Sequence, residues 1–303
     1  YVTPITTLIR WFPDKRGLVT GLAVMGYGLG SFIMGNVGPH LIIQFGPDRT
    51  FILWGCISLV LVLSSVLFFR NPPEGWSPAS PAGEKKTSTV RSVSFTFSEA
   101  VRTPQFWFLW GLVFLIVSSG LGLISQLSPM AQDIMISQAG TGLTKDRLDA
   151  IAIASGGIVA LAAVFNGIGR LLWAWVSDAI GRKRVFTLLF STGAVGCIIL
   201  GQSTGITLFT VLICYLLACY GGGLACMPAF AADEFGEAHI GKIYGVIFSA
   251  CGLAGIAGPY VFAVIKDMTS SFSAALYIEA ALLASGLMIT LAYKSPRRKH
   301  EAA

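Results

Sequence analysis

The chain has 303 residues, of which 54% are hydrophobic and only 12% charged, and its mean hydropathy is +0.72. Soluble domains carry about 25% charged residues, so this composition excludes an ordinary soluble domain and indicates a protein with several membrane spans. The net charge of +6 comes from basic residues that recur in every second loop. That distribution indicates a fixed membrane topology and argues against nucleic acid as a partner.

Apolar runs between polar breaks predict an all-α integral membrane protein with eight spans. About 20 apolar residues suffice to cross the hydrocarbon core of a bilayer. The approximate limits of the predicted spans are 17–45, 51–69, 105–132, 151–177, 185–203, 206–231, 241–265 and 273–293. Residues 71–104 are rich in Pro, Ser and charge, which predicts a flexible linker between two helical bundles.

The basic residues are distributed unequally between the two sides of the predicted membrane. Sixteen of the 21 Lys and Arg residues lie on the side of the linker and the C-terminus, four lie on the other side, and Arg170 lies inside a span. Loops rich in Lys and Arg stay in the cytoplasm. We therefore expect a multi-pass protein of the plasma or bacterial inner membrane, with the linker and the C-terminus in the cytoplasm and the lipid bilayer as its surroundings.

An internal repeat relates the first predicted span to the seventh. Two glycine trios share spacings of four and seven residues and lie 224 positions apart: Gly17, Gly21 and Gly28, and Gly241, Gly245 and Gly252. If the four spans between the two trios also have counterparts 224 positions upstream, about four spans, or about 120 residues, are expected before Tyr1. Repeated halves with a site at their interface are typical of transporters. Packing of small residues between helices is the alternative explanation for the glycines.

The repeat predicts two six-helix halves, of which this chain holds a part. Residues 1–70 are expected to form the C-terminal part of the first half, with its last two helices. Residues 71–104 form the cytoplasmic linker, residues 105–294 the complete second half of six helices, and residues 295–303 a cytoplasmic tail.

Arg170 lies deep inside the span predicted at 151–177, eight residues before Asp178. Eight helical residues correspond to about 12 Å, which is too deep for the side chain to reach the interface comfortably. An arginine at such a depth costs at least ~2.5 kcal/mol on insertion scales, and such residues face water-filled cavities or partners. We therefore predict that Arg170 binds an organic anion.

Three further residues are candidates for the same site. Asn166 lies four positions before Arg170, on the same helix face, although an interhelical hydrogen bond would equally explain it. Tyr220 precedes the run Gly221–Gly223, where a bend could act as a hinge for a gate, and its hydroxyl could meet a carboxylate; packing is the alternative. Gln126, near Pro129, could line the cavity. Glu279, the other charged residue inside a span, is explained by interfacial placement or pairing, with a coupling proton as the second interpretation.

The loop after the Arg170 span carries a carboxylate, a glycine and a basic cluster at close spacing. Asp178 can pair with Arg182 or cap the next helix, Gly181 permits a tight turn, and Lys183 continues the basic cluster. This loop resembles the D-x-x-G-R-K signature of the major facilitator superfamily, with Ala174 in place of its leading glycine. The resemblance covers the whole chain and implies a gating role for the loop.

Several segments resemble the oxalate/formate antiporter family and its relatives that carry monocarboxylates. They are WFPDKRGLVTGLA, RNPPEGW, RTPQFWFLW, SQLSPMAQ, FNGIGRLLWAWVSDAIGRKRVF and CYGGGLACMPAFAADEFG. The resemblance implies that Arg170 binds the substrate carboxylate and that Phe248 and Cys251 lie at the site. Oxalate carriers have a lysine on the span that corresponds to 241–265, and here Cys251 occupies that position. One cation suits a monocarboxylate better than a dianion, unless the expected upstream spans supply another.

The resemblance implies a secondary transporter that moves small organic anions by alternating access. Asn166 cannot carry a proton, which favours exchange or uniport over proton symport. An exporter of another small solute or drug, a carrier-like sensor that does not transport, and a chain inactive as it stands are the alternatives. No catalytic constellation is apparent, and the three histidines are scattered, so we expect no enzyme activity, no cofactor and no metal site. We expect a monomer.

Overall fold

The computed structural model of the protein describes residues 7, 11, 16–70, 73, 95–236 and 239–294. Within residues 16–29 it describes the backbone alone, apart from Gly26. All regular elements in these ranges are helices. They are α2 (Arg16–Phe45), α3 (Pro47–Val66), α4 (Phe97–Val101), α5 (Pro104–Ala139), α6 (Lys145–Ile180), α7 (Arg182–Gln202), α8 (Ile206–Phe235), α9 (Ile240–Phe248), α10 (Ala250–Thr269) and α11 (Phe272–Ala292).

The all-α fold class is confirmed. In the described residues, α3, α5, α6, α7, α8, the continuous stretch Ile240–Thr269 and α11 are each long and apolar enough to cross a membrane. The helix α2, with 30 residues, corresponds to the first predicted span. Most of the predicted linker, residues 71–72 and 74–94, and the predicted tail lie outside the described residues.

Two of the predicted spans are shorter than the helices that contain them. Helix α5 continues past residue 132 to Ala139, and α6 begins at Lys145 rather than at 151. The apolar run ends at the membrane boundary, but backbone hydrogen bonding continues into water until a residue breaks it. Here Gly140, with φ at 85°, ends α5.

The seventh predicted span is divided into α9 and α10 at Ser249. The Ser249 amide donates to Val246 O, and the Gly252 amide donates to Ser249 O. These bonds span three residues instead of four and tighten the helix locally. The Trp110 indole of α5 donates to Ser249 Oγ at 3.3 Å, which ties this irregular turn to the neighbouring helix.

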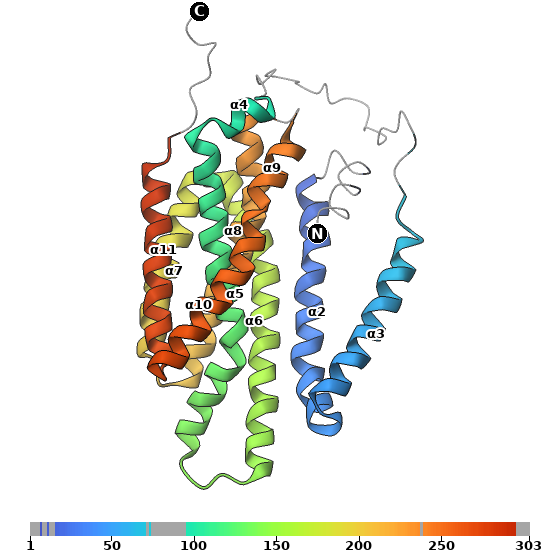
Figure 1. The fold of residues 1–303 in the computed structure, drawn as a ribbon, viewed down its shortest axis with the longest axis vertical. Coiled ribbons are helices and arrows are strands. Elements are labelled where there is room, and N and C mark those ends of the chain that lie inside the picture. Colours follow the sequence, from blue (N-terminus) through green and yellow to red (C-terminus); the bar gives the residue numbers. More distant parts are fainter. Residues whose placement is uncertain are drawn as a thin grey trace, which may run out of the picture.

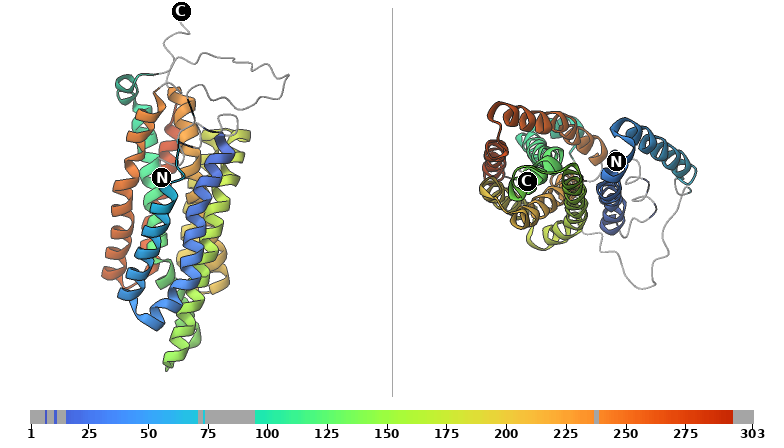
Figure 2. Two further views of the ribbon diagram at one scale, coloured as in Figure 1. Left: turned by 90° about the vertical axis from the view of Figure 1, so that its right-hand side faces the viewer. Right: turned by 90° about the horizontal axis from the view of Figure 1, so that it is seen from below.

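The helices α5 to α11 form a bundle, and α2 and α3 lie along one side of it (Figure 1, Figure 2). Within the bundle α6 packs on α8, α7 on α11, and α10 on α5. Helix α2 packs on α6, and α3 packs on α2. The short helix α4 leads into α5 and begins with a capping box between Thr96 and Glu99.

The contact between α2 and α6 is close enough to require glycine. A Cβ atom on Gly156 of α6 would overlap the Gly35 carbonyl oxygen and the Pro39 ring of α2. Small residues allow helix backbones to approach each other within a membrane. Gly35 and Gly156 therefore fix where these two helices meet.

Candidate functional site

Arg170 lies on α6 and is buried, with 7% of its surface exposed. Its Nε atom donates to Asn166 Oδ1 over 3.4 Å, a long bond. Its buried Nη1 atom has no hydrogen-bond partner among the described residues. A buried cation with an unused hydrogen-bond donor carries a desolvation penalty. An anion bound to Nη1 would offset this penalty.

Asn166 connects Arg170 to α8. Its Nδ2 atom donates to the Leu217 carbonyl oxygen at 2.9 Å, and the side chain is buried. A Cβ atom on Gly221 would overlap the Asn166 carbonyl oxygen and would lie 3.1 Å from Arg170 Cγ. The interhelical bond expected as an alternative for Asn166 is therefore present, and the same residue also orients Arg170.

Tyr220 is half-buried on α8, one residue before Gly221. Its ring packs against Gly120 of α5, where a Cβ atom would overlap it. Tyr220 also lines a cavity of about 20 Å³ together with Ser119 and Cys219. The structure thus brings Asn166, Arg170 and Gly221 together at the contact between α6 and α8, whereas the Tyr220 ring lies against α5, and its proposed role stays a prediction.

The three glycines after Tyr220 act in packing. Helix α8 continues without a break from Ile206 to Phe235. Gly221 contacts Asn166 and Arg170, Gly222 contacts Trp173, and Gly223 contacts Ile116 of α5. The run Gly221–Gly223 therefore allows α8 to approach α6 and α5 closely, and the helix is not interrupted at the predicted hinge.

The structure does not bring Phe248 and Cys251 to Arg170. Phe248 ends α9, with its ring 5.7 Å from that of Tyr244, and Cys251 is a half-buried free thiol on α10. In the described part of the chain, α6 has no extensive interface with α9 or α10. Gln126 is half-buried on α5, and no described contact joins it to Arg170. The proposed roles of these three residues stay predictions.

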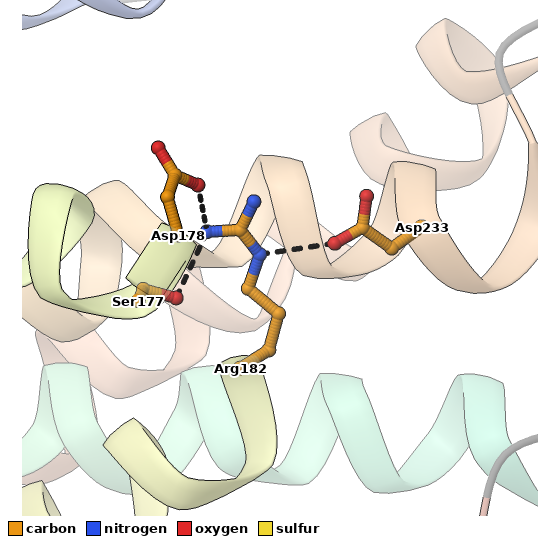
Figure 3. A network of polar contacts seen from close by, with 4 residues as sticks. All are labelled: Ser177, Asp178, Arg182 and Asp233. Carbon is orange, nitrogen blue, oxygen red and sulfur yellow. Dashed lines mark hydrogen bonds and ion pairs between the residues drawn. The ribbon is translucent and has the colours of Figure 1, made fainter. Parts of the chain in front are cut away.

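The signature loop forms a polar network that joins three helices (Figure 3). Arg182 Nη1 contacts Asp178 Oδ1 at 2.6 Å and donates to Ser177 Oγ at 2.9 Å. Arg182 Nε donates to Asp233 Oδ2 of α8 at 3.0 Å. Of the two roles predicted for Asp178, the structure has the ion pair. Gly181 caps α7 with φ at 93° and without a side-chain cap, which agrees with the predicted turn.

The sequence analysis missed two partners of Arg182. Asp233 follows the apolar run of α8, and Ser177 ends the apolar run of α6. Their positions at the ends of spans are the sequence feature that could have identified them as partners of Arg182. Lys183 also has a partner that the sequence did not reveal. Its Nζ atom donates to the carbonyl oxygens of Leu291 and Tyr293 at 3.1 and 2.7 Å, which ties the start of α7 to the end of α11.

No group of three or more metal-binding side chains occurs among the residues that the structure describes. All six cysteines are free thiols. The polar side chains that the described residues bring together at the α6–α8 contact near Gly221 are the Arg170 guanidinium and the Asn166 amide.

Comparison with known sequences identifies relatives over most of the chain. The sequence model of the Major Facilitator Superfamily matches residues 1–259 and 114–303. The chain is 28% identical to an uncharacterized MFS-type transporter, YhjX, of Escherichia coli (strain K12), over 84% of this chain and 59% of that protein. It is 30% identical to the oxalate:formate antiporter of Oxalobacter formigenes, over 85% and 57%. It is 23% identical to human monocarboxylate transporter 11, over 95% and 59%.

The chain spans about three-fifths of the length of these curated relatives. All three relatives carry the names of transporters.

Proposed function

The chain belongs to the major facilitator superfamily, and from this premise we propose that it is part of a secondary transporter of small organic anions. In this proposal Arg170 binds the carboxylate of the substrate. The protein crosses the membrane several times, and the substrate passes between two helical halves whose relative movement exposes the site to each side in turn.

The observation that carries this proposal is the buried and incompletely bonded guanidinium of Arg170. The Nη1 atom has no partner in the described residues, while Asn166 holds Nε at 3.4 Å. A guanidinium offers a planar fork that matches the two oxygens of a carboxylate. An intramembrane arginine with unused donors supports an anion-binding role.

The charge near Arg170 supports a monocarboxylate rather than a dianion. In the described part of the chain, the salt bridges found are those of Arg182 with Asp178 and Asp233, and Arg170 forms none. One cation balances one carboxylate, and a second carboxylate in the low-dielectric span would lack compensation. The names of two relatives, an oxalate:formate antiporter and a monocarboxylate transporter, include both classes of cargo.

In this proposal the Arg182 network lies on the cytoplasmic side of the transporter. The excess of basic residues on the side of the linker supports a cytoplasmic position for this side, and we expect the protein in the plasma or bacterial inner membrane. The network lies at the junction of α6, α7 and α8 (Figure 3). We expect a monomer, in which the network holds these three helices together as one body during the transport cycle.

The test uses the longest natural chain that contains this sequence, reconstituted in liposomes. Uptake of labelled formate, lactate, pyruvate and oxalate is measured with and without each anion inside. We expect saturable uptake that is lost in Arg170→Gln and strongly reduced in Arg170→Lys, because lysine lacks the planar fork. Arg147→Gln, an exposed arginine in the first turn of α6, is the matched control and should transport normally.

Transport at the wild-type rate in both Arg170 variants would contradict the proposed role of Arg170. Failure of the folded wild-type protein to take up any of the four anions would point to another small solute.

A further inference from the structure

Glu279 is a second ionisable residue buried inside the bundle, and the proposed function does not use it. It lies on α11, seven positions after Phe272, where the helix begins, and only 3% of its surface is exposed. Its Oε1 atom is buried and has no hydrogen-bond partner among the described residues. The Ser119 hydroxyl of α5 is the hydrogen-bonding neighbour of this carboxyl.

Among the residues that the structure describes, the side chains around Glu279 offer no compensating cation. Helix α11 packs on α7, α5 and α10. The titratable group that faces Glu279 from α7 is the buried thiol of Cys197, and α5 contributes Ser119. Lys183 of α7 is bound to the Leu291 and Tyr293 carbonyl oxygens, and Lys266 of α10 lies over the Phe272 ring. An ionised carboxylate without a partner is unfavourable in such surroundings, so this arrangement favours the protonated form.

A small cavity is lined by Ser119, the hydrogen-bonding neighbour of this carboxyl. Its volume is about 20 Å³, which is enough for one water molecule. Its polar wall comes from Ser119, Cys219 and Tyr220, and Leu283 of α11, one turn after Glu279, also lines it. Ser119 thus contacts Glu279 and borders the cavity, which Tyr220, the residue before Gly221, also lines.

A chain of neighbouring residues links the two ionisable sites, with polar groups on the side of Glu279 and close backbone packing on the side of Arg170. Glu279 neighbours Ser119, Ser119 and Tyr220 line the same cavity, and the next residue on α8, Gly221, packs against the Asn166 backbone and the aliphatic part of Arg170. A hydroxyl and a water molecule can each accept and donate a proton. The charge state of Glu279 can therefore be linked to the helix that contacts Arg170.

We propose that Glu279 is a proton-binding site, and that binding and release of this proton are coupled to anion movement at Arg170. The bound ligand is a single proton held on the carboxyl, which leaves through Ser119 and the cavity. Asn166, beside Arg170, cannot exchange a proton. In this proposal the proton carrier is Glu279, which lies on a different helix. The coupling rests on the proposed transport function, whereas proton binding does not depend on transport.

Proton binding is tested on the purified natural protein by infrared difference spectroscopy across a pH titration. A protonated carboxyl has a carbonyl stretch that an ionised one lacks. We expect a titrating band of this kind in the wild type and its loss in Glu279→Gln, which keeps the shape and removes the titration. Asp133→Asn, an exposed acid on α5, should retain the band. A wild-type spectrum without a titrating band, or a band unchanged in Glu279→Gln, would overturn the proposal.

Coupling is tested in liposomes that contain a pH-sensitive dye. We expect anion uptake by the wild type to move protons, and Glu279→Gln to lose proton movement while it still exchanges labelled anion for anion. Unchanged proton movement in Glu279→Gln would overturn the coupling. If no anion is transported but the titrating band behaves as expected, the proposed function fails while the proton-binding site stands. Equal melting temperatures of the variants establish that they are folded.

Discussion

Helix α6 makes two close contacts through glycine, and they differ in what else holds them. Towards α8, Gly169 meets the Ala218 backbone, and Asn166 also donates a hydrogen bond to Leu217 O. Towards α2, Gly156 meets Gly35 and Pro39, and in the described residues no side-chain hydrogen bond between the two helices accompanies this contact. Both contacts thus depend on close packing at glycine, and among the described side chains the α6–α8 contact adds an interhelical hydrogen bond.

This difference indicates which contact can open. Separating α6 from α8 would leave buried polar groups without partners, which costs about 1–3 kcal/mol for each group. Among the described side chains, separating α6 from α2 gives up close packing alone. We therefore expect α6 and α8 to move as one unit around Arg170, while α2 separates from α6 during transport.

The largest expected effect is that of Gly169→Ala. The new Cβ atom would overlap the backbone of Ala218, and such overpacking costs about 1–3 kcal/mol or more. We expect a clear fall in the melting temperature of the purified protein, with loss of transport. Gly157→Ala on the same helix is the control, because nothing lies within 4 Å of its Cβ position, so its melting temperature should not fall.

Gly156→Ala should separate stability from transport. Its Cβ atom would push against Gly35 of α2 and destabilise the arrangement in which the two helices touch. Each 1.4 kcal/mol changes the population of that state about tenfold. We expect uptake to fall while the melting temperature falls less than in Gly169→Ala. Equal losses of stability in the two variants would show that both contacts are equally structural.

Asn166→Ala tests the interhelical hydrogen bond directly. It removes the bond to Leu217 O and the acceptor that holds Arg170 Nε, which should lower the free energy of unfolding by about 1 kcal/mol and weaken anion binding. Asn36 of α2 is the matched control, since the hydrogen bond described for its amide is to Phe32 O in its own helix. Asn36→Ala should leave anion binding unchanged.

The smallest expected effect is that of Asp233→Asn. It removes one ion pair of Arg182, whose partner carboxylate is 56% exposed, and exposed pairs contribute about 0.2–1 kcal/mol. We expect a small decrease in stability that disappears at high salt. A decrease of the same size at high and low salt would show that the charge of Asp233 is not what matters.

Sequence periodicity predicted those parts of the site that lie on a single helix or at its end. The four-residue spacing placed Asn166 beside Arg170, and the loop spacing paired Asp178 with Arg182; both pairs are present. Contacts between helices were not predictable in this way. The Asp233–Arg182 pair depends on how α7 and α8 pack, which no local pattern encodes.

The residues that resemblance alone suggested are the least supported by the structure. Phe248 and Cys251 flank the irregular turn at Ser249, which the hydropathy of the span did not reveal. Hydropathy also placed the end of α5 too early and the start of α6 too late, because it reports the thickness of the membrane and not the length of the helix. The burial of Glu279 against Ser119 became apparent only from the packing of α11 on α5.

The central claim is that Arg170 binds the carboxylate, and ligand-induced stabilisation tests it most directly. A ligand that binds the folded protein raises the free energy of unfolding by RT ln(1 + [L]/Kd), which is about 2.7 kcal/mol at 100 times Kd. The melting temperature of the purified natural protein is measured with increasing formate, lactate, pyruvate or oxalate, beside Arg170→Gln and the control Arg147→Gln. We predict saturable stabilisation in the wild type and in Arg147→Gln, and none in Arg170→Gln. Equal stabilisation of all three proteins would contradict the claim.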